Sequence, residues 1–411
     1  MKTVLVIGTY DTKSEELAYL ADRIKSQGGA VLTMDVSVLG DPPQATTVSK
    51  HDVAAAAGSS IPDVIASGDE NSAMQIMAKG ASALVKQLHA EKRFDGMIAM
   101  GGTMGTDLAL DCARALPMGV PKYIISTVSF SPLIPPDRLS PDIQMILWAG
   151  GLYGLNSICK SSLSQAAGAV LGAARAVEPP AGGRPIIGMM SLGTSCLTFM
   201  KTLKPALETR GFEVAVFHAT GMGGMAFEGL AAKGAFAAVM DFALGELSNL
   251  TVGSVANGGA DRLLSAGRAG IPQIVAPGAM DMIDFPTWQA VPSRFANRPY
   301  HAHNRLIASA VLNGDERRVT AREIGARLSR AKAPAHVILP LHGIEEWDKE
   351  GGPCHDPEGL AAFLDEMKTA IKPPVALTRL KAHINDPVFC ETALKIFDGW
   401  LADGTVLRST V

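Results

Sequence analysis

The sequence has few cysteines, and none of them stands at a spacing typical of crosslinks or metal ligands. Its five cysteines are scattered over 411 residues, and no two form a Cys-x-x-Cys pair. An odd number of dispersed cysteines is typical of reduced thiols rather than of a disulfide framework or a zinc knuckle. We therefore expect a cytoplasmic protein.

An excess of positive charge and long hydrophobic runs are also absent. Lys and Arg number 37 against 40 Asp and Glu, so no broad field exists to hold nucleic acid or an anionic membrane. No apolar stretch reaches the ~20 residues that a transmembrane helix needs. The apolar run at residues 3–7 is too short for the core of a signal peptide. We expect no nucleic-acid or membrane partner, and any phosphate site must be local.

The usual nucleotide-binding signatures are missing as well. The sequence contains neither the P-loop pattern G-x-x-x-x-G-K-[ST] nor an intact G-x-G-x-x-G. Walker chemistry and a standard nicotinamide site are therefore not expected.

What the sequence does contain is enough apolar material for two domains. Hydrophobic residues make up 47% of the chain, and strand-like apolar runs alternate with helical patterns. This alternation predicts an α/β protein with two doubly wound, mostly parallel, Rossmann-like domains and a cleft between them. The Pro/Gly-rich residues 178–185 mark the boundary, which gives domains at 1–178 and 185–411. Within the second domain, residues 305–312 are expected to be helical.

The most informative stretch follows the apolar run at residues 96–100. Two glycines end this predicted strand, and a helical pattern begins near Leu108. Such a turn directs backbone N–H groups and the positive end of a helix dipole at one point, which suits a phosphate. The residues expected to form this cradle are Gly101, Gly102, Thr103, Gly105 and Thr106.

The loop after the first predicted strand adds charge to this interpretation. It contains Thr9, Asp11, Thr12 and Lys13. Lys13 could neutralise a phosphate, while Asp11 and a threonine hydroxyl could hold a hydrated Mg²⁺. An alternative is that Asp11 and Thr12 only cap the following helix and that Lys13 is solvated. Both interpretations stay open, and the expected ligands of this loop are a phosphorylated molecule and Mg²⁺.

Two further strand ends, at residues 191–195 and 220–224, carry glycine and hydroxylated residues. Ligands of open parallel sheets bind beyond the carboxyl ends of the strands, so four loops become candidates for a phosphorylated ligand.

The second half also contains candidate acid–base groups. His218 ends a predicted strand, Glu228 lies in the first turns of the next helix, and His301 stands close to His303. His218 could equally be an ordinary buried histidine, and His301 with His303 could either bind metal beside Asp281 and Asp284 or make structural contacts. These groups support an alternative function, a metabolic enzyme acting on a small oxo- or hydroxy-acid in the cleft. The acidic residues 345–350 are expected to form a solvated loop.

Several motifs resemble a family of uncharacterised two-domain bacterial proteins that has the tomato mosaic virus resistance protein as its plant relative. In the first half these motifs are residues 7–13 with Glu15 and Glu16, the turn at 101–106, and the pairs at 128–129, 142–143 and 156–157. In the second half they are residues 218–224, 278–282, 356–358 and 383–387. The turn at 101–106 is also similar to the Gly-Gly-Asp-Gly-Thr loop of NAD kinase and phosphofructokinase, but Thr103 stands in place of the aspartate.

The resemblance implies an ATP-binding module with Mg²⁺, paired Rossmann-like domains and a tendency to form homodimers. In the plant relative this module binds a viral replication protein and is followed by a TIM-barrel domain. Since the sequence here ends at Val411, any barrel partner is expected to be a separate chain. The resemblance leaves enzymatic turnover open.

Overall fold

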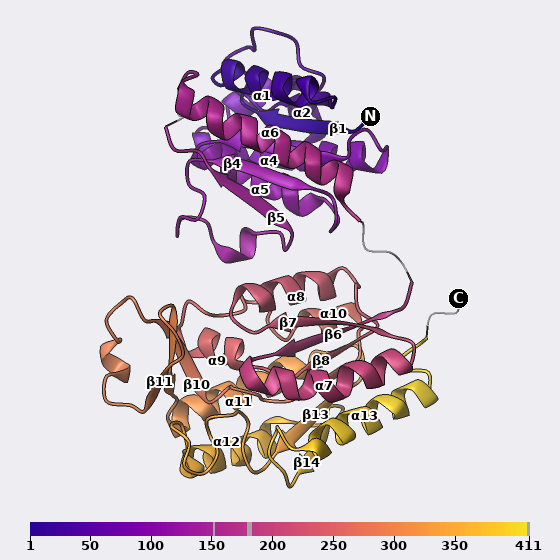
Figure 1. The fold of residues 1–411 in the computed structure, drawn as a ribbon, viewed down its shortest axis with the longest axis vertical. Coiled ribbons are helices and arrows are strands. Elements are labelled where there is room, and N and C mark those ends of the chain that lie inside the picture. The colour runs from indigo at the N-terminus through magenta and orange to yellow at the C-terminus, as the bar shows by residue number, and fades with distance from the viewer. Residues whose placement is uncertain (151–152, 179–182, 409–411) are drawn as a thin grey trace. The chain divides into compact units, whose positions relative to one another are not determined.

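The computed structural model describes residues 1–150, 153–178 and 183–408. The chain divides into two compact units, Met1–Ala181 and Gly182–Val411, and each is described by itself (Figure 1). Residues 179–182 of the predicted boundary lie outside the described part. The predicted α/β class with two mostly parallel, Rossmann-like domains is confirmed. The cleft between them stays a prediction.

The N-terminal unit is built on a five-stranded parallel sheet of order β2-β1-β3-β4-β5. Its strands are β1 (Thr3–Gly8), β2 (Ala30–Asp35), β3 (Gly96–Gly101), β4 (Lys122–Ser126) and β5 (Ile143–Leu147). Its helices are α1 (Ser14–Ser26), α2 (Lys50–Ala56), α3 (Ile61–Ile65), α4 (Glu70–Ala90), α5 (Thr103–Ala115) and α6 (Ser157–Ala176).

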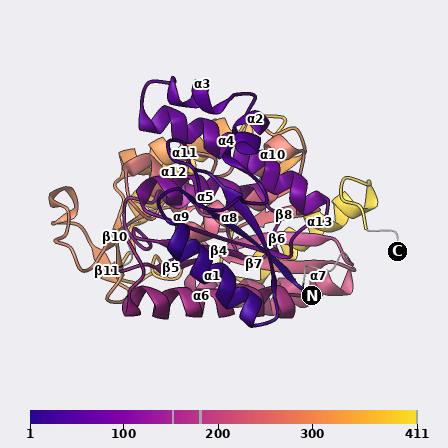
Figure 2. The same ribbon diagram turned by 90° about the horizontal axis from the view of Figure 1, so that it is seen from above.

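Helices cover both faces of this sheet, which explains the unbroken apolar run of β1. Leu5 and Ile7 pack into one core with α4 and α5, whereas Val4 and Val6 pack into another with α1 and α6. Neighbouring residues of a strand point to opposite faces, so a strand that is covered twice must be apolar throughout. Figure 2 shows α2, α3 and α4 on one side of these strands and α1 and α6 on the other.

The C-terminal unit contains a six-stranded parallel sheet of order β14-β13-β9-β8-β6-β7. Its strands are β6 (Ile186–Ser191), β7 (Glu213–His218), β8 (Ala238–Asp241), β9 (Gln273–Val275), β13 (Ala335–Pro340) and β14 (Ala376–Leu380). Its helices are α7 (Gly193–Thr209), α8 (Met222–Ala232), α9 (Gly245–Val252), α10 (Ser265–Ala269), α11 (Gly314–Leu328), α12 (Pro357–Ala370) and α13 (Pro387–Ala402).

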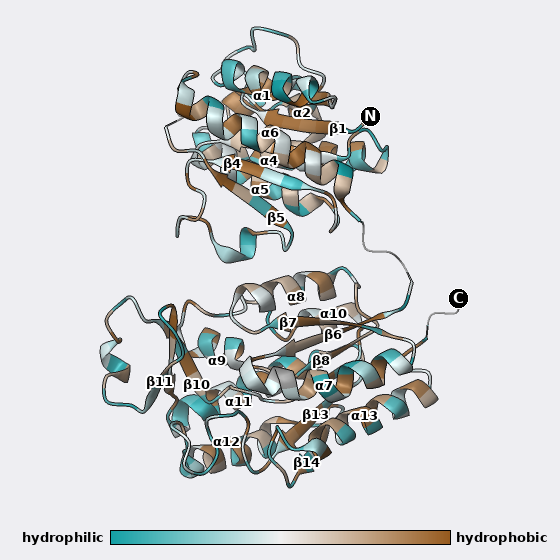
Figure 3. Cartoon of the chain, in the orientation of Figure 1, coloured by the Kyte–Doolittle hydropathy of each residue, from teal (hydrophilic) through white to brown (hydrophobic). Residues whose placement is uncertain are grey.

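The core of this unit is also two-sided. Phe199 of α7 contacts Phe389 of α13, with ring centroids 5.2 Å apart, in a cluster that also contains Met189 of β6. The next residue of β6, Met190, belongs to a different cluster with α8 and α10. Figure 3 shows the hydrophobic strands of both units between helices with mixed surfaces. Within the described residues, no helix is long and apolar enough to cross a membrane.

A small antiparallel sheet between β9 and β13 corrects one prediction. Its strands β10 (Met282–Pro286), β12 (Ile307–Val311) and β11 (Tyr300–Ala302) pair in the order β10-β12-β11. The helix expected at residues 305–312 is wrong, because β12 occupies most of that segment. Its sequence, Ile-Ala-Ser-Ala-Val, is too short to show a helical or strand period, so pairing with β10 and β11 determines its structure.

Candidate functional site

Two of the predicted loops leave adjacent strands of the N-terminal sheet. Residue Ile7 of β1 pairs with Ala99 of β3, so residues 9–13 and 101–106 begin at the same edge. The strand order reverses between β1 and β3, because β2 lies beyond β1 and β4 lies beyond β3. Such a reversal is the usual ligand position in an open parallel sheet.

The loop at residues 9–13 does not cap α1 through its side chains. Lys13 is the N-cap residue, and among the described residues no side chain makes a cap hydrogen bond there. Instead, the Thr9 and Thr12 hydroxyls lie 3.0 Å apart, and Asp11 Oδ2 accepts a hydrogen bond from the Gly40 N–H at 3.1 Å. The first helical N–H groups of α1 therefore have no side-chain acceptor among the residues that the structure describes.

Asp11 and Lys13 are the charged groups predicted for this site. Asp11 Oδ1 is buried and has no hydrogen-bonding partner among the described residues. This free carboxylate oxygen fits a hydrated Mg²⁺, which takes one or two carboxylates together with water and phosphate. The Lys13 ammonium lies 5.8 Å from the ring centroids of both Trp148 and Tyr153, which hold it by cation–π contacts.

The turn at residues 101–106 is tighter than the sequence predicts. Helix α5 begins at Thr103 rather than near Leu108, and its N-cap, Gly102, makes no side-chain cap hydrogen bond. A Cβ atom on Gly101 would lie 2.6 Å from the Gly105 Cα, so this position needs glycine for packing. The backbone of the turn can therefore meet an anion at the helix N-terminus.

The surroundings of Thr106 and Thr103, the two threonines of the predicted cradle, differ from those expected of side chains that bind a phosphate. Thr106 is 1% exposed, and its hydroxyl contacts the Gly102 carbonyl at 2.7 Å and the Ser126 hydroxyl at 2.6 Å. Its N–H also donates to the Gly102 carbonyl, at 2.9 Å, so Thr106 shapes the turn rather than facing a ligand. Thr103 lines a surface pocket with the acidic Asp69 and Asp107. Any phosphate here would depend on backbone N–H groups.

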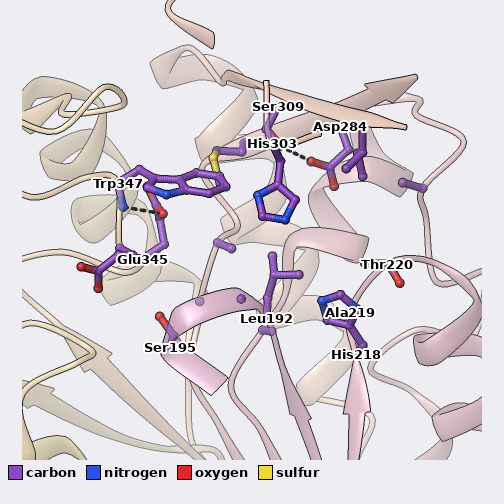
Figure 4. A pocket seen from close by; sticks show the side chains of 18 of the residues that line it. Leu192, Ser195, His218, Ala219, Thr220, Asp284, His303, Ser309, Glu345 and Trp347 are labelled. Atoms are coloured by element: carbon purple, nitrogen blue, oxygen red, sulfur yellow. Dashed lines mark hydrogen bonds between the residues drawn. The ribbon is translucent and has the colours of Figure 1, made fainter. Parts of the chain in front are cut away.

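The C-terminal unit contains a cavity of about 610 Å³ at the reversal of its own strand order. Residues after β6 and β8, two adjacent strands, form its floor. Strands β10 and β12, with the loop that joins β11 to β12, form one wall, and residues 344–347 form another (Figure 4). This volume is typical of small-molecule sites.

The N-terminus of α7 opens onto this cavity. Gly193 begins the helix with a φ of +56°, a value that favours glycine, and Thr194 and Ser195 line the cavity. The N-cap residue Leu192 has no polar side chain, and the described residues provide no other side-chain cap. The orphan N–H groups and the helix dipole thus favour an anion at this end.

Two histidines line the same cavity from different elements. His218 ends β7, and the His303 ring points from the loop between β11 and β12 toward the strand end that carries His218 (Figure 4). Burial lowers the pKa of His218, and the nearby His303 lowers it further. Asp284 accepts hydrogen bonds from the Ser309 hydroxyl at 2.5 Å and the Asn249 amide at 2.7 Å, while burial raises its pKa. His218 can therefore act as a neutral base near neutral pH.

Glu345 is buried in the cavity wall, so the expectation that residues 345–350 are solvated is wrong for this position. It is 5% exposed, and its Oε2 accepts a hydrogen bond from the Trp347 N–H at 2.7 Å. Its Oε1 has no partner among the described residues. Burial, together with the carboxylate of Asp281, raises the pKa of Glu345 to about 9. Near neutral pH, Glu345 is thus a carboxylic acid with an O–H to donate.

The other two predicted catalytic side chains lie elsewhere. Glu228 is buried, accepts hydrogen bonds from the backbone N–H groups of Leu263 and Ser265 at 2.5 and 2.9 Å, and does not line the cavity. The ring of His301 packs against Trp347 at a tilt of 40°, with centroids 4.1 Å apart, and also lies outside the lining. Within the described residues, no group of three or more His, Cys, Asp or Glu could hold a metal ion.

Backbone N–H groups of the loop at residues 220–224 already donate to an acceptor within the protein. Glu246 Oε1 accepts hydrogen bonds from the Gly221 and Gly224 N–H groups at 2.5 and 3.0 Å, and Oε2 accepts one from Arg262 Nε at 2.8 Å. Arg262 also pairs with Asp241 and Glu228, and all four side chains are buried. A phosphate cradle predicted from glycines is therefore occupied by a carboxylate that no sequence spacing connects to it.

Comparisons with known proteins match both halves of the chain. Residues 2–179 match the Uncharacterised protein family (UPF0261) N-terminal domain, and residues 184–401 match the C-terminal domain of the same family. A UPF0261 protein of Brucella melitensis is 56% identical over 408 residues, which cover 99% of this chain and 98% of the relative. The resemblance expected from the motifs is confirmed.

More distant similarities extend to a plant protein and to solved structures. The ToMV resistance protein Tm-1(GCR237) of Solanum lycopersicum is 28% identical over 424 residues, which cover 96% of this chain but 55% of the plant protein. A UDP-GlcNAc 2-epimerase structure from Methanocaldococcus jannaschii matches 67% of this chain and 83% of its own, at 9% identity and a TM-score of 0.22. A TM-score this low supports no functional inference.

Proposed function

The chain belongs to UPF0261, a two-domain α/β family of unassigned function, and we propose that its N-terminal unit binds ATP with Mg²⁺. The phosphates would lie between residues 9–13 and the turn at residues 101–105. Both segments follow adjacent strands at the edge where the strand order reverses.

One observation carries this proposal. The helices that follow these two loops, α1 and α5, both begin without a side-chain cap among the described residues. Two open helix N-termini beside one strand reversal provide several backbone N–H donors and two positive dipole ends for a polyphosphate.

The side chains supply the remaining chemistry. Lys13 would neutralise phosphate charge, and Asp11 Oδ1 would hold Mg²⁺ directly or through water. The bound Mg²⁺ would supply positive charge to the phosphates. A homodimer and a separate TIM-barrel partner stay predictions from the family resemblance.

Calorimetric titration of the full chain with ATP, with and without Mg²⁺, tests the nucleotide site. We expect Lys13→Ala to weaken binding about tenfold or more, because it removes the cation of the site. Lys160→Ala is the matched control, since the Lys160 ammonium lies 5.8 Å from the Tyr19 ring in the same unit. Unchanged affinity in Lys13→Ala would overturn the assignment. Phosphate release measured on the same samples reports whether ATP is hydrolysed.

The position of His218 favours a second function, acid–base chemistry on a small oxo- or hydroxy-acid. Three side chains, His218, Glu228 and His301, are predicted to be catalytic, and of these only His218 lines the cavity of the C-terminal unit. Turnover of such an acid that is lost in His218→Ala and needs no nucleotide would support this function, and turnover that survives the substitution would contradict it.

A further inference from the structure

We propose that the cavity of the C-terminal unit binds a small carboxylic acid with an aromatic or branched apolar body, whose carboxylate lies at the N-terminus of α7 and whose carbonyl or hydroxyl oxygen accepts a hydrogen bond from Glu345. The proposal specifies a ligand for the cavity of the second function. It does not depend on nucleotide binding in the N-terminal unit.

The N-terminus of α7 provides the place for the carboxylate. Helix α8, which packs against the same sheet, shows which group such a helix N-terminus binds. The N–H groups of Gly221 and Gly224 there donate hydrogen bonds to the Glu246 carboxylate. Helix α7, which begins after the adjacent strand β6, has no such carboxylate among the described side chains. An external carboxylate can therefore take the corresponding position, beside the Thr194 and Ser195 hydroxyls.

Glu345 provides an independent reason to expect a ligand. A side chain that is 5% exposed and lines a cavity carries an oxygen, Oε1, without a partner among the described residues. A buried polar group without a hydrogen-bonding partner destabilises a protein, so such groups normally have a partner. As a neutral acid, Glu345 donates its proton to an acceptor and does not repel an anion. A keto or hydroxyl oxygen of the ligand meets this requirement.

The charge of the lining favours a carboxylate over a phosphate. The described lining contains no Lys or Arg, and its basic side chains are His218 and His303. A helix N-terminus carries roughly half a positive charge, which suits a monoanion better than a dianion. Asp284 and Glu346 also line the cavity and would repel a second negative charge.

The rest of the lining is apolar and partly aromatic, which defines the body of the ligand. It includes Phe242, Phe285, Trp288, Leu306, Trp347 and Ile384. Trp288 is 69% exposed, so it contributes a ring to the cavity without being needed for the core. Aromatic rings on several sides favour a flat or branched body of modest size.

Calorimetric titration of the full chain with benzoylformate, phenylacetate and phenyl phosphate tests the proposal. Benzoylformate carries a carboxylate, a keto oxygen and a ring, and we expect it to bind most tightly. Phenylacetate lacks the keto oxygen and should bind about tenfold more weakly, because the hydrogen bond with Glu345 is lost. Phenyl phosphate should also bind more weakly. Tighter binding of phenyl phosphate, or no binding of either acid, would overturn the proposal.

Two substitutions locate the ligand. Ser195→Asp places a carboxylate in the first turn of α7, where it favours the helix, so the protein should stay folded while benzoylformate affinity falls at least about tenfold. Thr202→Asp makes the same charge change at an exposed position of α7 and should leave affinity unchanged. In Glu345→Leu, benzoylformate and phenylacetate should bind with similar affinity.

Three results would contradict this placement. They are wild-type affinity in Ser195→Asp, an equal loss in Thr202→Asp, and a keto preference that survives in Glu345→Leu. Lys13→Ala should bind benzoylformate like the wild type, which separates failure here from failure of the nucleotide site. If the protein binds benzoylformate but does not turn it over, the second function fails while the proposed ligand site stands.

Discussion

The carboxylate of Glu246 occupies the space that a side chain on Gly224 would need. A Cβ atom on Gly224 would lie 1.9 Å from Glu246 Oε2, while the Gly224 N–H donates to Oε1 at 3.0 Å. Glu246 is buried, and Arg262 Nε holds its Oε2 at 2.8 Å, so the carboxylate cannot move aside. Glycine at position 224 therefore serves a buried ion network.

Gly224→Ala should lower the free energy of unfolding by about 2–4 kcal/mol, because the added methyl group displaces a buried, paired carboxylate. Urea denaturation measures this change. Gly229→Ala is the control, since Gly229 lies in the same helix, α8, and a Cβ there has no atom within 4 Å. We expect Gly229→Ala to raise stability by up to about 1 kcal/mol. Equal stability of the two variants would show that the network tolerates displacement.

Gly101→Ala should destabilise the N-terminal unit by about 1–3 kcal/mol, because the methyl group would overlap the first turn of α5. The closest atom, Gly105 Cα, is 2.6 Å from the Cβ position. In Gly102→Ala the closest atom is Thr127 Oγ1 at 3.9 Å, and the φ of −76° suits alanine. Thermal unfolding should thus separate the two variants. A loss in Gly102→Ala as large as in Gly101→Ala would contradict this account of the turn.

Glu345→Gln should stabilise the protein more at pH 8 than at pH 5. The pKa of Glu345 is raised to about 9 in the folded protein, whereas the usual pKa of a glutamate is 4.5. Between these two pH values the unfolded chain therefore binds fewer protons than the folded protein does. Stability conferred by the raised pKa is complete below pH 4.5 and is lost as the pH rises toward 9. Glutamine removes this loss.

Urea denaturation of wild type and Glu345→Gln at the two pH values measures this difference. Glu391→Gln, at an exposed position of α13, is the control and should show the same small effect at both. A Glu345→Gln effect independent of pH would mean that this carboxyl titrates normally.

His303→Gln should raise the pKa of His218 toward its ordinary value of 6.5. Burial is the larger cause of the lowered pKa and persists in the variant, so the return should be partial. The pH dependence of the imidazole NMR signals measures it. His301→Gln, which removes a ring packed against Trp347, should leave the His218 pKa unchanged. A His218 pKa that does not rise in His303→Gln would exclude charge coupling between the two imidazoles.

The sequence is sufficient to predict the parallel sheets, because strands buried on both faces must be apolar throughout. The predicted strand at residues 3–7 coincides with β1. The sequence of β12 does not distinguish a strand from a helix, because its five small or branched residues show no period. Its structure depends on strand β10, which lies more than 20 residues earlier in the chain; for example, Met282 of β10 pairs with Val311 of β12.

The candidate sites were less predictable, because they depend on strand order and on burial. Composition indicates the loops at residues 9–13 and 101–106, but their position at one strand reversal follows from the pairing of β1 with β3. Glu345 lies in an acidic stretch whose sequence predicts a solvated loop, and only tertiary packing buries this side chain. Arg262 meets Glu228, Asp241 and Glu246 at irregular spacings, so no motif indicates the network.

The small sheet of β10, β11 and β12 gives the C-terminal unit a replaceable part. Its strands pair with one another, in a sheet separate from the six-stranded one. The sheet and the loop between β11 and β12 nevertheless supply Asp284, Ser309 and His303 to the cavity lining. Insertions and substitutions in this segment can change the shape and charge of the cavity while the register of the large sheet is kept. Members of the family could thus differ in this cavity and still share one scaffold.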